Sequence, residues 1–422
     1  MKSVSLVLLL ALATGTAIPA QERAGAGEAE LVTLRALQAE VERVHPSLRA
    51  AEQSIQAKRA RVSQARTLPD PMVAVGWMGD PAPFRVQRGD PSSFRFFEAR
   101  EEIPYPGKLR LRGQLASQEA EAERWALDGL RRRLRAEVAE AYFALWGTER
   151  AIAISEQNKV LLEKLARIAE EKYRVGEGLQ QDVLRAQVEV SRFLQRLTVL
   201  RQQRQTLVAR LNTLRLLPPD APLGPLAPVE KTELFYSLEE LLDRAVAENP
   251  EIRQQEERIE QEQYAVLLAR REYYPDFEIR YMYQQRPVMP DMHGIAFGIR
   301  IPVFYKSKQR EAVNEAAASL AAARQQREAI RTELFYAVQQ HYLTARASEQ
   351  LLALYRKGIV PQSTLALESA LAAYQVGRLD FLSVITNFIT VLDYEIEYYN
   401  ELAKYQTALA RLEEITAMEL LP

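Results

Sequence analysis

Three short segments of the chain alternate apolar residues with polar or small ones, a period of two that predicts β-strands. The longest is close to ten residues, the length at which a tilted strand crosses the hydrocarbon of a membrane. We expect β-hairpins at about 71–104 and 275–303, with a lipid-facing row formed by Val73, Val75, Trp77, Phe277, Ile279, Tyr281, Tyr283, Ile295, Phe297 and Ile299. On pattern alone, two soluble hairpins packed against helices remain an alternative.

The fourth strand, 94–103, has a less regular pattern. Glu98, Arg100 and Glu102 continue the face that Phe94 and Phe96 begin, so apolar and charged side chains share one parity. The pattern therefore leaves the two faces of this strand unassigned.

Two very long segments carry the spacing of helices. Residues 107–172 contain no proline, and apolar residues from Leu130 to Leu145 recur at helical intervals. Residues 305–373 repeat this pattern, with Pro361 as the point where the helix is expected to kink. A helix of about 66 residues is ~100 Å long, which no compact globular core requires. Without the strands, a filamentous coiled coil would fit equally well.

The second half of the chain repeats the first. Pro250 follows Pro46 by 204 residues, and Tyr374 follows Tyr173 by 201 residues. We expect two copies, at about 29–216 and 236–418, each ordered as helix, two strands, very long helix, turn and helix. A proline-rich linker, 217–235, joins them, because its five prolines up to Pro228 rule out a continuous helix.

The first 20 residues have the layout of a secretory signal peptide: Lys2, a largely apolar run from Val4 to Ala13, and small residues up to Ala20. An uncleaved anchor is the alternative, although the apolar run is shorter than the roughly 20 residues of a membrane span. We therefore expect an exported protein in which residues 21–422 form one domain.

Composition excludes several classes of function. The 55 basic and 56 acidic residues leave no basic excess for nucleic-acid binding, so no nucleic-acid partner is expected. The absence of cysteine removes disulfides, thiolate catalysis and cysteine-ligated metals. With three scattered histidines, no catalytic set, metal site or cofactor is predicted, and the chain is not expected to be an enzyme.

Membrane insertion of these strands would require several chains. About eight strands is the practical minimum for a closed barrel, and an open sheet in lipid leaves unpaired edges. A dimer would pool eight strands and a trimer twelve, and only the larger barrel leaves room for a water-filled lumen.

The chain resembles the TolC family of outer-membrane efflux ducts over essentially its whole mature length. The resemblance is carried by the duplication, the hairpins, the long helices and two matching motifs. These motifs are Tyr-Arg-Val-Gly-Glu-Gly-Leu (173–179) with Asp182-Val183-Leu184, and Tyr-Gln-Val-Gly-Arg-Leu-Asp (374–380) with Val384-Ile385. Leu-Pro-Asp-Pro (68–71) and Pro-Tyr-Pro-Gly-Lys-Leu (104–109) are more similar to the CzcC-like branch of heavy-metal efflux.

The resemblance implies a mainly α fold with a small β part, assembled as a homotrimer. Its 12-stranded transmembrane β-barrel would lie in the outer membrane of a Gram-negative bacterium, in contact with lipid, and its helical barrel in the periplasm. The helical tips would dock a periplasmic adaptor and an inner-membrane pump, which deliver substrate for passive exit. The tip residues expected to make this contact are Val175, Gly176, Gly178, Leu179, Val376, Gly377 and Leu379.

Members of this family often close the tip with acidic residues just after the turn. Here Asp182 occupies such a place, but its counterpart in the second copy is Ser383, and Asp380 is off register. We hypothesise a looser gate around Asp182, Asp380 and Arg378. Two alternative functions stay open: an exported soluble coiled-coil structural or adaptor protein, and the duct of a type I protein secretion system.

Overall fold

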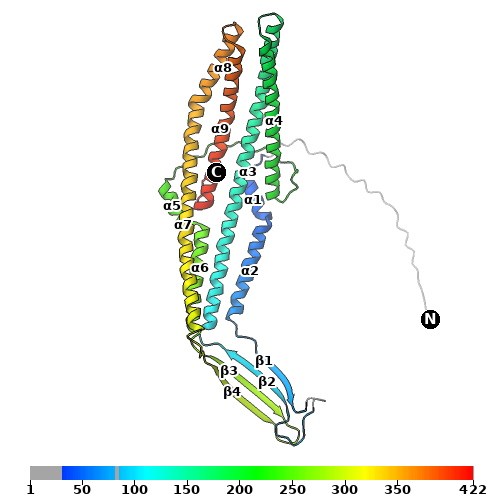
Figure 1. Cartoon of the computed structure of the whole chain (residues 1–422), viewed down its shortest axis with the longest axis vertical. Helices are drawn as coiled ribbons and strands as arrows, with labels where there is room; N and C mark the ends of the chain where they lie inside the picture. The colour runs from blue at the N-terminus through cyan, green and yellow to red at the C-terminus, as the bar shows by residue number, and fades with distance from the viewer. Residues whose placement is uncertain (1–30, 81–84, 422) are drawn as a thin grey trace, which may run out of the picture.

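The computed structural model describes residues 31–80 and 85–421, so the predicted signal peptide lies outside the described residues. The molecule is a long rod with a small sheet at one end and two helical hairpin tips at the other (Figure 1). The fold is mainly helical with a small β part, as the sequence predicts.

Each half of the chain contains the same order of elements. The first half forms α1 (Leu34–Val44), α2 (Pro46–Arg66), β1 (Met72–Met78), β2 (Phe94–Ile103), α3 (Lys108–Arg174) and α4 (Gln180–Leu214). The second half forms α5 (Leu238–Glu248), α6 (Pro250–Arg271), β3 (Asp276–Gln285), β4 (Met292–Arg300), α7 (Gln309–Leu354), η1 (Tyr355–Ile359), α8 (Val360–Gln375) and α9 (Phe381–Thr416). The predicted duplication is confirmed.

The long helices of the two copies differ in continuity. Helix α3 runs unbroken for 67 residues, whereas the matching rod is divided by the π-helical turn η1 between α7 and α8. Pro361 follows η1 directly. Because proline has no N–H and its ring crowds the carbonyl four residues earlier, at Lys357, the regular ladder cannot continue there. The interruption expected at Pro361 therefore takes the form of a π-turn.

The four strands form one antiparallel sheet in the order β1-β2-β3-β4. Strands β2 and β3, which come from different copies, pair from Arg95↔Gln285 to Ile103↔Phe277. The two predicted hairpins therefore share a single sheet. Across 31–80 and 85–421, none of the helices combines the length and apolar character needed to span a membrane.

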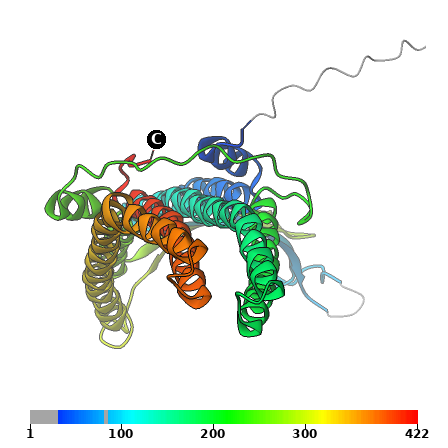
Figure 2. The same cartoon turned by 90° about the horizontal axis from the view of Figure 1, so that it is seen from above.

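Helix α3 is the centre of the helical layer. It packs against α2 and α6 toward the sheet and against α4 and α9 toward the tips, while α7 packs against α6 and α9. Figure 2 shows the helices as one curved layer, with α1, the linker and the C-terminal segment along one side. Helix α4 and the α7–α8 rod are the two edges of this layer in the tip half of the molecule.

Buried tyrosines hold the segment between the two copies. The Tyr142 hydroxyl donates to the carbonyls of Val32 at 3.2 Å and Ala227 at 3.3 Å. The Tyr405 hydroxyl donates to the carbonyl of Thr232 at 2.7 Å. Residues 217–235 contain no helix, and these bonds satisfy part of their exposed backbone. The segment is thereby fixed across the middle of the rod.

Candidate functional site

The first helical tip turns between α3 and α4. Gly176 has a φ of 78°, in the left-handed region. Its N–H donates to the carbonyl of Tyr173 at 3.1 Å, and the N–H of Glu177 donates to the carbonyl of Lys172 at 2.9 Å. These two bonds form a Schellman motif, which satisfies the last carbonyls of α3 and ends the helix.

The second tip, between α8 and α9, repeats this geometry. Gly377 has a φ of 71°, its N–H donates to the carbonyl of Tyr374 at 3.1 Å, and the N–H of Arg378 donates to the carbonyl of Ala373 at 2.9 Å. A Cβ added to Gly176 or Gly377 would meet no atom within 4 Å. Both positions therefore require glycine because of their positive φ, and not because a side chain would lack space.

Gly178 is needed for a different reason. Its φ is not positive, but an added Cβ would lie 2.9 Å from the backbone N of Tyr173 and 3.1 Å from the backbone carbon of Lys172. The turn folds closely over the end of α3 here. Gly178 is therefore required for the room that it leaves, because a side chain here would meet the backbone of α3.

Three of the four apolar residues expected at the docking tips lie on the surface. Val175 and Leu179 are each 67% exposed and Val376 is 68% exposed. Leu379 instead packs against the hydrophobic core that α3, α4, α8 and α9 share near the tips. The two turns thus present a valine each, and only the first adds an exposed leucine.

A lysine connects the two tips. The Lys172 ammonium donates to the carbonyl of Tyr374 at 2.8 Å and lies 4.3 Å from the centre of the Tyr374 ring. Burial, together with the negative charge of Asp182, raises the pKa of the Tyr374 hydroxyl. The sequence does not indicate this role of Lys172, because the two tip motifs do not show which residues of one tip contact the other.

The predicted gate residues divide into two groups. Asp380 caps α9, since its carboxylate accepts the N–H of Ser383 at 3.3 Å, and hydrogen bonding to Ser383 lowers the pKa of this carboxyl. Asp182 lies in the first turn of α4. Within the described part of one chain, Asp182, Arg378 and Asp380 form no ion pair with one another. The gate remains a prediction.

The sheet has two chemically different faces. Antiparallel register places all ten residues of the predicted apolar row on one face and adds Phe97, Ala99 and Ile103 of β2 to it. Phe297 and Val75 are each 78% exposed in the single chain. Arg95, Glu101 and His293 also lie on this face. We call it the apolar face.

Register also resolves the strand that the pattern left unassigned. Phe94 and Phe96 lie on the opposite face, together with Glu98, Arg100 and Glu102. Phe96 is accommodated there because it faces Gly76, where an added Cβ would lie 2.6 Å from its ring. The opposite face, which we call the charged face, also carries Glu278, Arg280 and Arg300.

A buried lysine fixes the junction between the sheet and the helices. Lys108, at the start of α3, is 1% exposed. Its ammonium contacts Glu272 Oε2 at 2.9 Å, Asp276 Oδ1 at 2.8 Å and the carbonyl of Tyr274 at 3.2 Å. These partners all belong to the second copy, so the 104–109 motif joins the copies where rod and sheet meet.

A family comparison matches both halves of the molecule. The model of the outer membrane efflux protein family matches residues 37–215 and again residues 241–417. The chain belongs to the outer membrane efflux protein family. Its double match follows the duplication seen in the fold.

Solved channel structures share this fold. The outer-membrane channel OprN is 20% identical, with a TM-score of 0.74, and the match covers 92% of this chain and 91% of that one. VceC of Vibrio cholerae is 18% identical, with a TM-score of 0.77, covering 92% and 97%. CusC is 15% identical, with a TM-score of 0.76, covering 91% of each chain. Among curated protein sequences, none matches.

Family membership and fold together support an outer-membrane efflux channel. They do not favour the alternative of an exported coiled-coil scaffold, because the matched proteins are channels of the outer membrane. They also give no reason to expect an enzyme. Within the described residues, no group of three or more His, Asp or Glu is placed to hold a metal ion.

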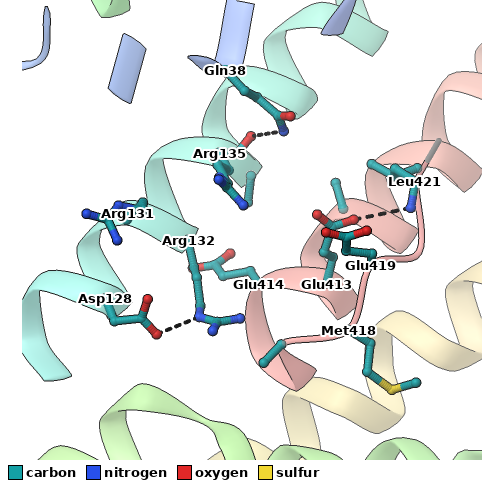
Figure 3. A pocket seen from close by; sticks show the side chains of 13 residues that line it. Gln38, Asp128, Arg131, Arg132, Arg135, Glu413, Glu414, Met418, Glu419 and Leu421 are labelled. Atoms are coloured by element: carbon teal, nitrogen blue, oxygen red, sulfur yellow. Dashed lines mark hydrogen bonds and ion pairs between the residues drawn. The ribbon is translucent and has the colours of Figure 1, made fainter. Parts of the chain in front are cut away.

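A charged pocket lies between α3 and the end of α9 (Figure 3). It has a volume of about 260 Å³ and contains three arginines and four carboxylates. Arg132 pairs with Asp128 at 2.9 Å, while Arg131 and Arg135 both pair with Glu42. The positive charges of these arginines are therefore already compensated by carboxylates of the same chain.

Proposed function

We propose that three copies of this chain form an exit duct across the outer membrane and periplasm of a Gram-negative bacterium. The chain would be exported by the signal peptide at 1–20. Its sheet would contribute to a 12-stranded barrel in lipid, and its rods would continue the lumen through the periplasm. Family membership supports an outer-membrane channel. The observation that supports a long duct is that the two-faced sheet and the paired tips lie at opposite ends of one rod.

Unpartnered edges support assembly of several chains. Strands β1 and β4 are the edges of the sheet, and among residues 31–80 and 85–421 each of them pairs with one strand. The helical edges expose large apolar side chains: Leu184, Val188, Leu194 and Val199 on α4, and Tyr336, Leu343, Leu351, Leu354 and Leu365 on α7 and α8. Contact of one edge with the opposite edge of the next chain closes a ring.

The tips would dock a periplasmic adaptor and an inner-membrane pump. Exposed Val175, Leu179 and Val376 offer apolar contacts at the two turns. Energy would come from the pump, and passage through the duct would be passive. The 104–109 motif supports cargo of the heavy-metal or small-molecule kind over a type I secretion substrate.

Fractionation of cells tests the duct directly. The full-length chain is expected to sediment with the outer membrane, and detergent extraction should yield a particle with the protein mass of three chains. Phe297→Arg places a charge on the apolar face, which costs about 2–4 kcal/mol in mid-bilayer, and should prevent assembly. Ala74→Arg, which places the same charge on the charged face opposite Glu98, is the control. A soluble periplasmic protein, or a single-chain particle, would contradict the proposal.

The gate requires a variant that separates charge from helix capping. Asp380→Asn keeps a good N-cap but removes the charge, whereas Asp380→Ala removes both. If Asp380 contributes charge to a gate, both variants should raise the conductance of the purified channel in planar bilayers. If only Asp380→Ala does so, Asp380 is a helix cap and not a gate residue.

A further inference from the structure

The charged face of the sheet carries three arginines and three glutamates, which form ion pairs mostly across strands. A further carboxylate on this face, Asp276, is already paired with Lys108. Arg100 lies 3.7 Å from Glu278, and Arg280 lies 3.5 Å from Glu98 and 2.9 Å from Glu278. Arg300 contacts both oxygens of Glu102, at 2.5 Å and 3.0 Å. Each of these glutamates therefore has an arginine within ion-pair distance.

Between β2 and β3 the ion pairs run diagonally, because charged residues that face each other in register on these two strands have like charge. Arg100 is directly opposite Arg280, and Glu102 is directly opposite Glu278. Like charges in register repel. Each row of residues in register therefore needs the opposite charges of the neighbouring row to offset this repulsion. Arg280 contacts carboxylates in the rows on either side of its own. It is the residue that links three successive rows of charge.

The outer strands leave space around these six charged residues, which we call the ridge. On the charged face, β1 presents Ala74 and Gly76, and β4 presents Gly294, Ala296 and Gly298. A Cβ on Gly298 would lie 3.3 Å from the Cβ of Glu278, so the glutamate lies directly over the glycine. Apart from Arg300 at the end of β4, the long charged side chains are thus concentrated on β2 and β3.

We propose that this neutral ridge sets the ion selectivity of the duct and that Arg280 is its specificity-determining residue. The inference rests on the proposed function, in which the charged face lines the lumen. A lumen wall whose fixed charges cancel neither concentrates nor excludes cations or anions strongly. It therefore suits zwitterionic cargo, or cargo of either sign. Loss of Arg280 would leave one excess carboxylate per chain and make the lumen attractive to cations.

Reversal potentials test this inference. The full-length protein, purified from the outer membrane, is placed in planar bilayers under a KCl gradient near 0.1 M, where the Debye length of about 10 Å leaves pore charges effective. The wild type should show a K⁺/Cl⁻ permeability ratio near one. Arg280→Gln should raise that ratio severalfold, and Glu98→Gln should lower it below one.

Two controls separate charge from damage to the sheet. Arg280→Lys keeps the positive charge and should behave as the wild type. Arg95→Gln removes a charge from the apolar face of the same sheet and should leave the ratio unchanged. If the wild type, Arg280→Gln and Glu98→Gln all conduct with the same permeability ratio, the inference is wrong. The proposed function is then unaffected. Absence of conductance from the wild type would overturn the proposed function, and the inference with it.

Discussion

Lys172 and Tyr374 join the two tips of the molecule: the lysine ammonium donates to the tyrosine carbonyl at 2.8 Å and lies 4.3 Å from the centre of its ring. The same carbonyl also accepts the N–H of Gly377 within the second Schellman turn. One cation from the first copy therefore stabilises the turn of the second copy. This contact joins the two tips, although 202 residues separate Lys172 from Tyr374 along the chain.

Replacing Lys172 should loosen the second tip more than the first. We expect Lys172→Met to remove a charge-assisted hydrogen bond and a cation–π contact, together worth about 1–2 kcal/mol at this half-exposed site. Hydrogen exchange of the amides in 374–380 should become faster in the purified protein. Lys164→Met, an exposed lysine on the same helix, is the control. Equal exchange rates in the two variants would show that Lys172 does not couple the tips.

The tip glycines should respond differently to asparagine. Gly176→Ala is expected to destabilise the turn by about 1–2 kcal/mol, because its φ is 78°, and Gly176→Asn by less, since asparagine enters this region more readily. At Gly178 both substitutions should be harmful, because any Cβ would press on the backbone of Lys172 and Tyr173. Limited proteolysis at the first tip measures the difference. Rescue of Gly178 by asparagine would contradict the steric explanation.

Lys108 should be essential to the junction of sheet and helices. Lys108→Met leaves Asp276 without its lysine partner, while Glu272 keeps only Arg112, at 3.6 Å. Loss of one partner from a buried pair costs about 3 kcal/mol. We expect a lower thermal midpoint of the helical circular dichroism signal in detergent. Lys306→Met, the exposed counterpart in the second copy, should have little effect.

A double variant tests whether the effect comes from the ion pair. Asp276→Asn in the Lys108→Met background removes one unpaired carboxylate and should recover part of the lost stability. If the stability losses of the two substitutions are strictly additive, Lys108 does not act through its ion pair with Asp276.

The contribution of Glu413 to the stability of the folded protein should decrease as pH rises. Glu413 Oε2 accepts the N–H groups of Leu420 and Leu421, each at 3.2 Å, and burial raises the pKa of this carboxyl (Figure 3). Between the unfolded pKa of about 4.3 and the raised folded pKa, the folded protein binds more protons than the unfolded chain. This group's contribution to stability is therefore present at low pH and is lost as pH rises through the folded pKa.

Glu413→Gln should remove this dependence while keeping an oxygen to accept both N–H groups. Its thermal midpoint should match the wild type at pH 4 and exceed it at pH 8, with Glu315→Gln, an exposed glutamate on α7, as the control. A difference between the wild type and Glu413→Gln that stays constant across this range would rule out the titration of Glu413 as the cause.

Sequence periodicity determined the elements of this fold. The helical spacing in 107–172 and 305–373, the alternation in three of the four strands and the repeat near 200 residues each reflect backbone geometry that acts locally. The Val-Gly turns were also predictable, because a left-handed residue at a helix end favours glycine whatever surrounds it. Pro361 likewise predicted where the second long rod is interrupted, because proline disrupts the helix at its own position.

Tertiary structure alone decided how these elements meet. The register of β2 against β3 places Phe96 on the charged face and Phe97 on the apolar face, and the packing of one copy on the other brings Lys108 to Glu272 and Lys172 to Tyr374. These contacts join segments more than 160 residues apart. Residue spacing fixes which side chains share a face of one element, but the partner of that face depends on how whole elements pack.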